Sequence, residues 1–175
     1  MLMKRLKAIA DKVPIASNVA DIGTDHGFIP VYLIKNHIAS RVIATDISPE
    51  SLDKAKRLIE AEGLTDYIEA RVGPGLKTIK AGEVDTVIIA GMGGILIKNI
   101  LEESPDVLKD IKTLILQPMN LQNELRHWLI ENMFTIKDEE LVMDNERIYE
   151  IMVVVHGQQE QWNEIELEIS PRLLS

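Results

Sequence analysis

The chain has 175 residues, a formal net charge of −9 and no cysteine, and 46% of its residues are hydrophobic. Disulfides and thiolate catalysis are therefore excluded. The acidic balance argues against binding of nucleic acid over the whole surface, because phosphate contacts depend on Lys and Arg. Every apolar run is shorter than the roughly 18 residues of a membrane helix, and no signal-peptide pattern opens the chain. We expect one domain of a cytoplasmic protein that binds no membrane.

Apolar periodicity predicts that helices and strands alternate along the chain. An amphipathic helix over residues 3–13 is expected to end at Pro14. Strands are expected at 17–22, 41–46, 67–72, 85–90 and 113–116. Helices are expected at 27–37, at 49–62, at 95–101 and after Asn120, while the stretch up to Gly82 forms either a short helix or a loop.

Residues at the ends of two predicted helices favour these boundaries. Ser48 followed by Pro49 is a typical helix start, and Gly63 is a typical end. Asn120 can cap the last helix, whose core face would carry Leu121, Leu125, Trp128 and Leu129.

The last two predicted strands, 134–143 and 148–155, are joined by the turn-rich residues 144–146, so we expect an antiparallel pair. Five strand–helix alternations followed by a hairpin predict an α/β fold. Its doubly wound, Rossmann-like sheet would be mostly parallel, with a C-terminal antiparallel hairpin. We expect this domain to span residues 1–156. Residues 157–175 would begin a further C-terminal segment.

The predicted ligand site is the turn after the first strand. The apolar run that includes Val19 leads through Asp21-Ile22-Gly23-Thr24-Asp25-His26-Gly27 into a helical pattern. Such a strand–turn–helix unit places its turn at the carboxyl end of the sheet, where ligands bind. Glycine allows the backbone to approach a ligand closely.

Two kinds of phosphate site do not fit this turn. A P-loop needs a G-x-x-x-x-G-K-[ST] pattern, which the sequence lacks. A dinucleotide site needs G-x-G-x-x-G with a pyrophosphate at the helix start. Here Asp25 would face that pyrophosphate, and two like charges about 4 Å apart repel each other by about 4 kcal/mol at an effective dielectric near 20.

A cationic, phosphate-free nucleoside such as S-adenosylmethionine (SAM) fits better. Asp46 ends the second predicted strand, where it could accept both ribose hydroxyls. Asp21 and Asp25 could hold the cationic amino-acid end. The alternative is that these three carboxylates only cap the helices that follow them.

Three motifs together resemble a known family. They are Asp21-Ile22-Gly23-Thr24-Asp25-His26-Gly27-Phe28-Ile29-Pro30, Ala90-Gly91-Met92-Gly93-Gly94, and Leu116-Gln117-Pro118-Met119 with the later Leu125-Arg126. In order and spacing they are similar to the bacterial tRNA (adenine-N1)-methyltransferases that modify adenine 22. The match extends from the first helix to about Leu174. It implies a class I methyltransferase fold, SAM as cofactor and tRNA as substrate and partner.

The resemblance also implies roles for residues. Adenine N1 attacks the methyl group with a lone pair, so the enzyme mainly orients the two reactants and flips out the base. The catalytic candidates are Asp25, His26 and Met92. The cofactor-binding candidates are Asp21, Gly23, Thr24, Asp25, His26, Asp46, Ile47, Gly73, Gly75, Gly91 and Met92. The substrate-binding candidates are Gly93, Gln117, Pro118, Asn120 and Arg126, of which Arg126 would either reach a phosphate or stay on the helix surface.

The sequence departs from the family in two places. Pro74 stands where the family usually has an Asp that binds the SAM adenine, so that contact would have to come from another group. The family usually continues into a helical C-terminal domain near the last residues of this chain. We therefore expect a truncated protein, or else a naturally short one, that binds tRNA weakly on its own.

Other features are less specific. Basic residues gather at 4–12 and 54–57, where a solvated helix face is the commoner reason for such a run. The four histidines lack metal-ligand spacing, so we expect no metal. The oligomeric state cannot be inferred. Two other functions stay open: a SAM-dependent methyltransferase of a small molecule, and a non-catalytic dinucleotide-binding module.

Overall fold

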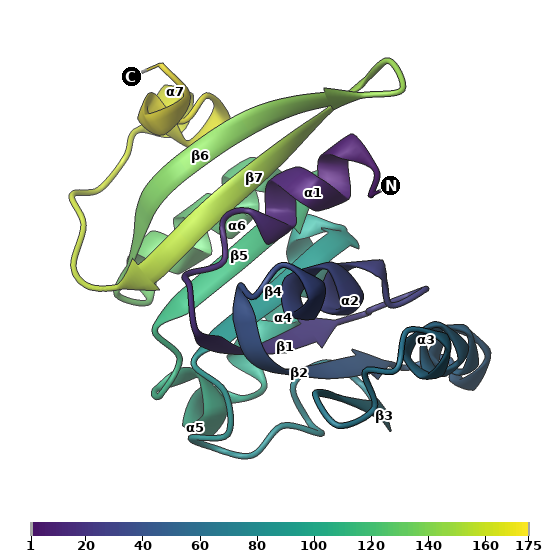
Figure 1. The fold of residues 1–175 in the computed structure, drawn as a ribbon. Coiled ribbons are helices and arrows are strands. Elements are labelled where there is room, and N and C mark those ends of the chain that lie inside the picture. The colour runs from purple at the N-terminus through teal and green to yellow at the C-terminus, as the bar shows by residue number, and fades with distance from the viewer. Residues whose placement is uncertain (1, 175) are drawn as a thin grey trace.

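A single sheet of seven strands lies between two layers of helices (Figure 1). The computed structural model describes residues 2–174, and the strands are counted within them. They are adjacent in the order β3-β2-β1-β4-β5-β7-β6. Their bounds are Ser17–Ile22 (β1), Ala39–Asp46 (β2), Ile68–Val72 (β3), Thr86–Met92 (β4), Thr113–Pro118 (β5), Phe134–Asp144 (β6) and Arg147–His156 (β7).

Strand directions confirm the predicted topology. Strands β1 to β5 pair in parallel, whereas β7 is antiparallel to both of its neighbours, β5 and β6. The sheet is therefore mostly parallel, with a C-terminal hairpin. Because β2 and β3 lie on one side of β1 while β4 and β5 lie on the other, the strand order reverses between β1 and β4. The carboxyl ends of strands at such a reversal form a crevice in which ligands bind.

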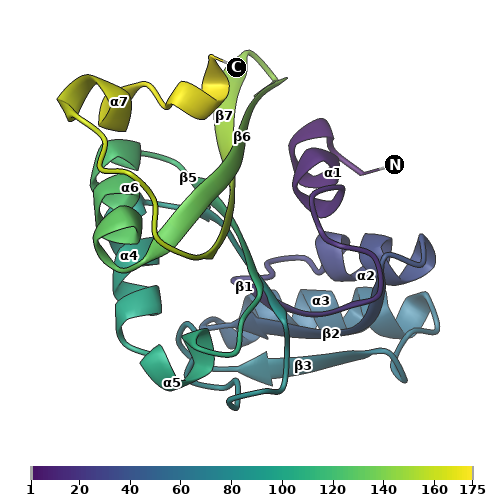
Figure 2. The same ribbon diagram turned by 90° about the vertical axis from the view of Figure 1, so that its left-hand side faces the viewer.

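Helices cover both faces of the sheet. Figure 2 shows α4, α5 and α6 on one side and α1, α2 and α3 on the other. The helix bounds are Lys4–Ala10 (α1), Phe28–Lys35 (α2), Pro49–Ala61 (α3), Gly94–Glu102 (α4), Pro105–Leu108 (α5), Gln122–Glu131 (α6) and Glu164–Glu168 (α7), and Pro171–Leu173 forms a short 3₁₀ helix (η1). In residues 2–174 no helix is both long enough and apolar enough to cross a membrane.

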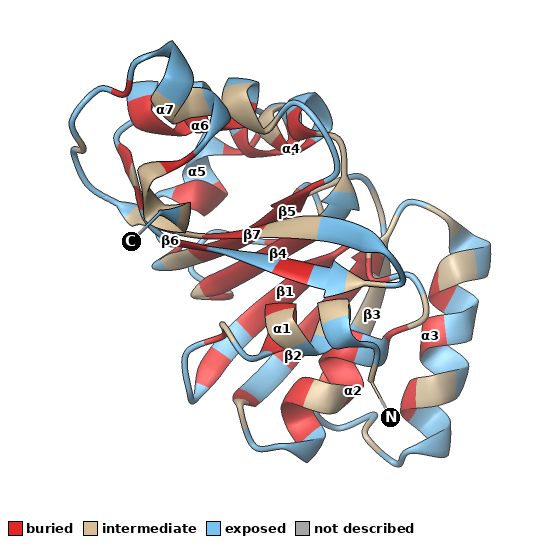
Figure 3. Ribbon diagram, turned by 90° about the horizontal axis from the view of Figure 1, so that it is seen from above, coloured by how far each residue is buried: buried red, intermediate tan, exposed pale blue. Residues whose placement is uncertain are grey.

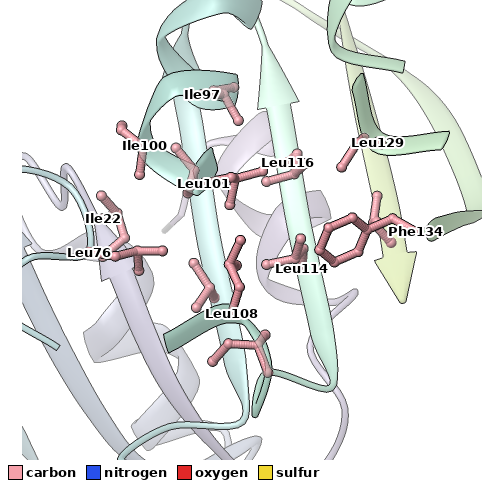
Figure 4. Close-up of a cluster of buried hydrophobic side chains, with 14 of the residues drawn as sticks. Ile22, Leu76, Ile97, Ile100, Leu101, Leu108, Leu114, Leu116, Leu129 and Phe134 are labelled. Atoms are coloured by element: carbon pink, nitrogen blue, oxygen red, sulfur yellow. The ribbon is translucent and has the colours of Figure 1, made fainter. Parts of the chain in front are cut away.

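The core consists of two apolar layers, one on each face of the sheet. Side chains alternate between the faces along a strand, so Ile22 of β1 packs toward α4 while Val19 packs toward α1 and α2. Figure 4 shows the first layer, in which Ile97, Leu101 and Leu116 meet. Figure 3 shows that the buried residues follow the sheet and the inner sides of its helices. The central strands are therefore covered on both faces, so a ligand can reach them only at their ends.

The start of α6 differs from the prediction. Asn120 does not cap this helix. Its backbone oxygen and Oδ1 accept the Gly94 amide of α4, at 3.0 and 3.3 Å. Leu121 occupies the N-cap position with φ at 48° and is about half exposed, so its predicted place on the core face is wrong. The apolar pattern could not reveal this, because the turn after β5 is fixed by contact with the turn after β4.

Residues 157–174 pack on the sheet domain. Helix α7 lies against α6 (Figure 2), and η1 contacts β6. Trp162 is buried and belongs to the apolar layer shared with α4 and α6. These short elements carry little periodicity of their own, which is why the sequence did not predict them. The same holds for the four-residue helix α5.

Candidate functional site

A cavity of about 750 Å³ opens at the carboxyl ends of β1, β2 and β4. One wall comes from α1 and α2, on one face of the sheet, and the opposite wall comes from α4 on the other face. All the residues predicted to bind a cofactor line it: Asp21, Gly23, Thr24, Asp25, His26, Asp46, Ile47, Gly73, Gly75, Gly91 and Met92. The fold thus brings together four segments that are far apart in the sequence, at the ends of β1, β2, β3 and β4.

The turn after β1 is held in one tight conformation. Gly23 has φ at 72°, and a Cβ there would come within 2.6 Å of the Met92 Cε atom. The Thr24 amide donates to the Thr45 backbone oxygen at 2.7 Å, which ties this turn to the end of β2. Glycine is therefore favoured here by the backbone conformation, and a larger residue would also have to displace the end of the Met92 side chain.

Asp46 is fixed by two backbone amides. Its Oδ2 accepts the Asp25 amide at 3.0 Å and its Oδ1 accepts the Ser48 amide at 2.9 Å. A carboxylate has about four acceptor positions, so two remain for a ligand in the cavity. Ser48, not Asp46, caps α3 by accepting the Ser51 amide.

The capping alternative also fails at the first turn. Helix α2 begins after Gly27 without a capping side chain. Asp25 instead lies with its Oδ2 3.1 Å from His26 Nδ1, and its side chain is 70% exposed at the cavity mouth. The His26 ring stacks on Phe28, with ring centroids 5.3 Å apart. Both carboxylates at this edge, Asp25 and Asp46, are thus free to face a ligand.

Asp21 is a buried carboxyl group at the base of the cavity. Only 3% of the residue is exposed, and its Oδ2 accepts the Thr24 hydroxyl at 2.8 Å. Burial raises the pKa of Asp21 to about 7, with smaller increases from the charges of Asp46 and Asp25 and a decrease from the Thr24 hydrogen bond. A cation placed beside Asp21 would favour its ionised form.

The turn after β4 is supported from behind by Gln117. This side chain is 1% exposed, and its Oε1 accepts both the Gly91 amide at 3.2 Å and Arg5 Nη1 at 2.8 Å. Gln117 therefore positions cavity residues without lining the cavity. The other predicted substrate residues in the turns after β4 and β5, which are Gly93, Pro118 and Asn120, do not line the cavity either.

The structure contradicts both roles that were predicted for Arg126. Its side chain is fully buried, so it neither reaches out to a phosphate nor lies on the helix surface. It forms two hydrogen bonds to Glu139, at 3.0 and 2.9 Å, and one to Glu150, at 2.6 Å. It also donates to the backbone oxygens of Leu167 and Glu168. Helical spacing alone could not show that acidic strand residues and a later segment close over it.

Several cavity residues were not predicted. They are Met3, Arg5, Leu6, Phe28, Ile29 and Thr45, together with Pro74, Ala90, Leu96, Asn99, Ile100 and Glu103, while Ile22 completes the lining. The basic run at 4–12 was the available signal for α1, but it indicated only a solvated face. Among residues 2–174, no group of three or more His, Asp or Glu could hold a metal ion.

This fold, with its cavity at the strand reversal, belongs to a methyltransferase domain. The family model described as "Methyltransferase domain" matches residues 2–152. The tRNA (adenine(22)-N(1))-methyltransferase of Bacillus subtilis (strain 168) is 41% identical over 156 residues, which cover 89% of this chain and 66% of that protein. The chain thus spans slightly less than two thirds of that relative.

Solved structures of similar proteins have the same fold as this chain. The Streptococcus pneumoniae protein Sp1610 in complex with S-adenosyl-L-methionine is 34% identical, with a TM-score of 0.94 over 98% of this chain and 80% of that chain. The M. capricolum TrmK in complex with S-adenosyl-homocysteine is 29% identical, with a TM-score of 0.87 over 96% of this chain and 75% of that chain. The chain belongs to the bacterial tRNA (adenine(22)-N(1))-methyltransferase family.

Proposed function

We propose that this chain is the catalytic part of a SAM-dependent enzyme that methylates N1 of adenine 22 in tRNA. One observation carries the proposal. The cavity at the strand reversal presents Asp21, Asp25 and Asp46, and Asp46 is aligned by two backbone amides. These groups suit a cationic nucleoside and would repel a pyrophosphate. The family to which the chain belongs supplies the reaction and the substrate.

The residues of the cavity fit SAM. Asp46 has two acceptor positions left for the ribose hydroxyls, and the carboxylates of Asp21 and Asp25 suit the ammonium group. Ile47 and the Gly73-Pro74-Gly75 turn offer apolar and backbone surface for the adenine ring. Pro74 provides no side-chain acceptor, so we propose that backbone groups of this turn bind the adenine amino group. Once bound, SAM would supply a methyl group on a positively charged sulfur.

The protein's own task is to position the acceptor base. The N1 lone pair of adenine needs no deprotonation, so orientation and exclusion of water supply most of the rate enhancement. We propose that Met92 and the Gly91 backbone form the surface under the flipped base, and that Asp25 and His26 contact its exocyclic amino group. Methylation leaves the purine cationic, so an acceptor there would bind the transition state more strongly than the ground state.

We propose that residues 1–156 form the methyltransferase domain and that 157–175 begin a C-terminal segment. The net charge of −9 predicts weak tRNA binding by these 175 residues alone.

Gln117, Pro118, Gly93 and Asn120 would act on the substrate indirectly, by shaping the turns beside the cavity. Such an enzyme would act where tRNA is processed, in the cytoplasm.

The test is methyl transfer from labelled SAM to an unmodified tRNA transcript with adenine at position 22. A transcript with guanine at that position serves as the control. We expect label on the first transcript only, and reverse transcription should stop at position 22. Transfer to free adenosine but not to tRNA would indicate a small-molecule methyltransferase. Binding of NAD but not of SAM would contradict the proposal altogether.

A further inference from the structure

The loop between β3 and β4 is held by Arg71, a residue of the edge strand β3. Its Nη1 and Nη2 donate to the two carboxylate oxygens of Glu83, at 2.8 and 2.6 Å, in the forked arrangement of a strong ion pair. Nη1 also donates to the Thr78 backbone oxygen at 2.7 Å, and Nε pairs with Glu69. The hydrogen bonds from Arg71 lower the pKa of Glu83 to about 2, so the pair is ionised at neutral pH. Arg71 therefore joins the strand to two points of the loop that follows it.

Thr78 connects this ion pair to the cavity wall. A Cβ at Gly73 would collide with Thr78 Cγ2, so the Thr78 methyl group packs directly on the Gly73 backbone. The Gly73 amide donates to the Asp46 backbone oxygen at 3.0 Å, which ties the same turn to the end of β2. Residues 73–75 line the cavity, whereas Arg71 and Thr78 do not. The position of this part of the wall therefore depends on an ion pair that lies outside the cavity.

The loop has a second set of contacts, which does not involve Arg71. Leu76 and Ile79 are 1% and 4% exposed and belong to the apolar layer that contains Ile100 of α4. Burial of these side chains would keep the loop folded if the ion pair were removed. The hydrogen bonds of Arg71 therefore add a fixed position for the turn at 73–75 to a loop that is already anchored.

We propose that the Arg71–Glu83 ion pair positions the turn at 73–75 so that its backbone selects the amino group of the SAM adenine, an assignment that rests on the proposed function. Pro74 offers no side-chain acceptor, so recognition at this turn depends on backbone groups alone. A hydrogen bond weakens steeply when its donor and acceptor are misaligned, so a backbone group discriminates between ligands only if it is held in place. Arg71 is thus a positioning residue, which acts through Thr78.

Two ligands that differ only at the pairing edge of the purine test this assignment without any methyl transfer. S-adenosylhomocysteine carries the amino group, and S-inosylhomocysteine carries an oxygen in its place. Calorimetry on the whole chain should show that the unaltered protein prefers the first ligand by about 10- to 100-fold, the effect of an unmade hydrogen bond at a buried group. Arg71→Met should reduce this preference to less than about threefold. Arg71→Lys, which keeps the charge without the fork, should retain part of it.

Glu83→Gln is the second variant, because it weakens the same ion pair without leaving an unpaired carboxylate in the loop. It should also lower the preference, and it decides the comparison if Arg71→Met does not fold. Arg41→Met is the matched control, since Arg41 also pairs with Glu69, at 3.2 Å, at the same edge of the sheet and does not line the cavity. It should leave the preference unchanged.

The ratio of the two affinities separates positioning from a merely structural role. Equal losses for both ligands in Arg71→Met, with or without a lower melting temperature, would overturn the assignment in favour of such a role. An unchanged preference in the variants of Arg71 and Glu83 would also overturn it. If the unaltered protein bound both ligands equally tightly, the turn would not select the amino group, and this inference would fail while the proposed function stood. If it bound neither ligand, the proposed function itself would fail.

Discussion

Replacement of Asp21 by Asn should make the ligand-free protein more stable at neutral and alkaline pH. The pKa of Asp21 is raised from 3.8 to about 7, chiefly by burial. The folded state therefore holds a proton that the unfolded state releases between these two values. This contribution to stability is fully present below about pH 3.8 and is lost as the pH rises through about 7. At roughly 1.4 kcal/mol per pKa unit, the ionised group costs at most about 4 kcal/mol above pH 7.

Asp21→Asn isolates this effect, because its side-chain oxygen can still accept the Thr24 hydroxyl while carrying no charge. The assay is urea unfolding of both proteins at several pH values between 5 and 8. The stability difference in favour of the variant should grow as the pH rises and level off above about 7. A difference that does not change with pH would refute the reasoning, since it would mean that Asp21 titrates alike in the folded and unfolded states.

The same titration should appear in ligand binding. An ammonium group beside Asp21 favours the ionised carboxylate, so binding of S-adenosylhomocysteine below pH 7 should release a proton. Its affinity should therefore rise with pH toward 7, by at most about tenfold per pH unit. Calorimetry in two buffers with different ionisation enthalpies would measure the released proton directly, and Asp21→Asn should abolish it.

Three further substitutions probe the cavity. Asp46→Ala should weaken binding of S-adenosylhomocysteine by roughly 100-fold, about 3 kcal/mol for two hydrogen bonds to a charge. Asp53→Ala, on the exposed side of α3, should leave the affinity unchanged. If Asp46→Ala bound the ligand as tightly as the unaltered protein, Asp46 would not belong to the site. Gly23→Ala should lower both the ligand affinity and the melting temperature. A residue other than glycine at a φ of 72° costs about 1–2 kcal/mol, and the alanine Cβ would displace the end of Met92. A variant that is fully active and equally stable would contradict this. Asp25→Asn, which tolerates the φ of 57°, should reduce turnover on tRNA with little change in melting temperature; a parallel loss of stability would assign Asp25 a structural role.

Residues whose role depends on local pattern were predictable from the sequence. Alternating strands and helices predict the sheet, and the three carboxylates at two neighbouring strand ends predict the acidic cavity wall. The glycines of the first turn belong to the same local signal, because strand, turn and helix are contiguous. These features need only the period of the apolar residues and the direction of parallel strands.

Residues whose role depends on distant contacts were not predictable. Arg5 reaches the cavity only because α1 packs on one face of the sheet and the Gln117 side chain of β5 accepts its Nη1. Gln117 is polar at a strand end, which suggested a substrate contact, yet it is buried behind Gly91. Asn120 looked like a helix cap because its local sequence permits one. In each case a contact across more than 20 residues determines the outcome, and periodicity carries no information about it.

The buried Arg126 has a consequence for how the molecule unfolds. Its guanidinium joins β6, β7 and the carbonyl groups at the end of α7 through five hydrogen bonds. If α7 detached alone, the buried Arg126 and Glu139 side chains would be exposed to water. Detachment of the last helix and melting of the sheet edge should therefore be one cooperative event, and amide hydrogens of α7 should exchange with solvent no faster than those of the terminal hairpin.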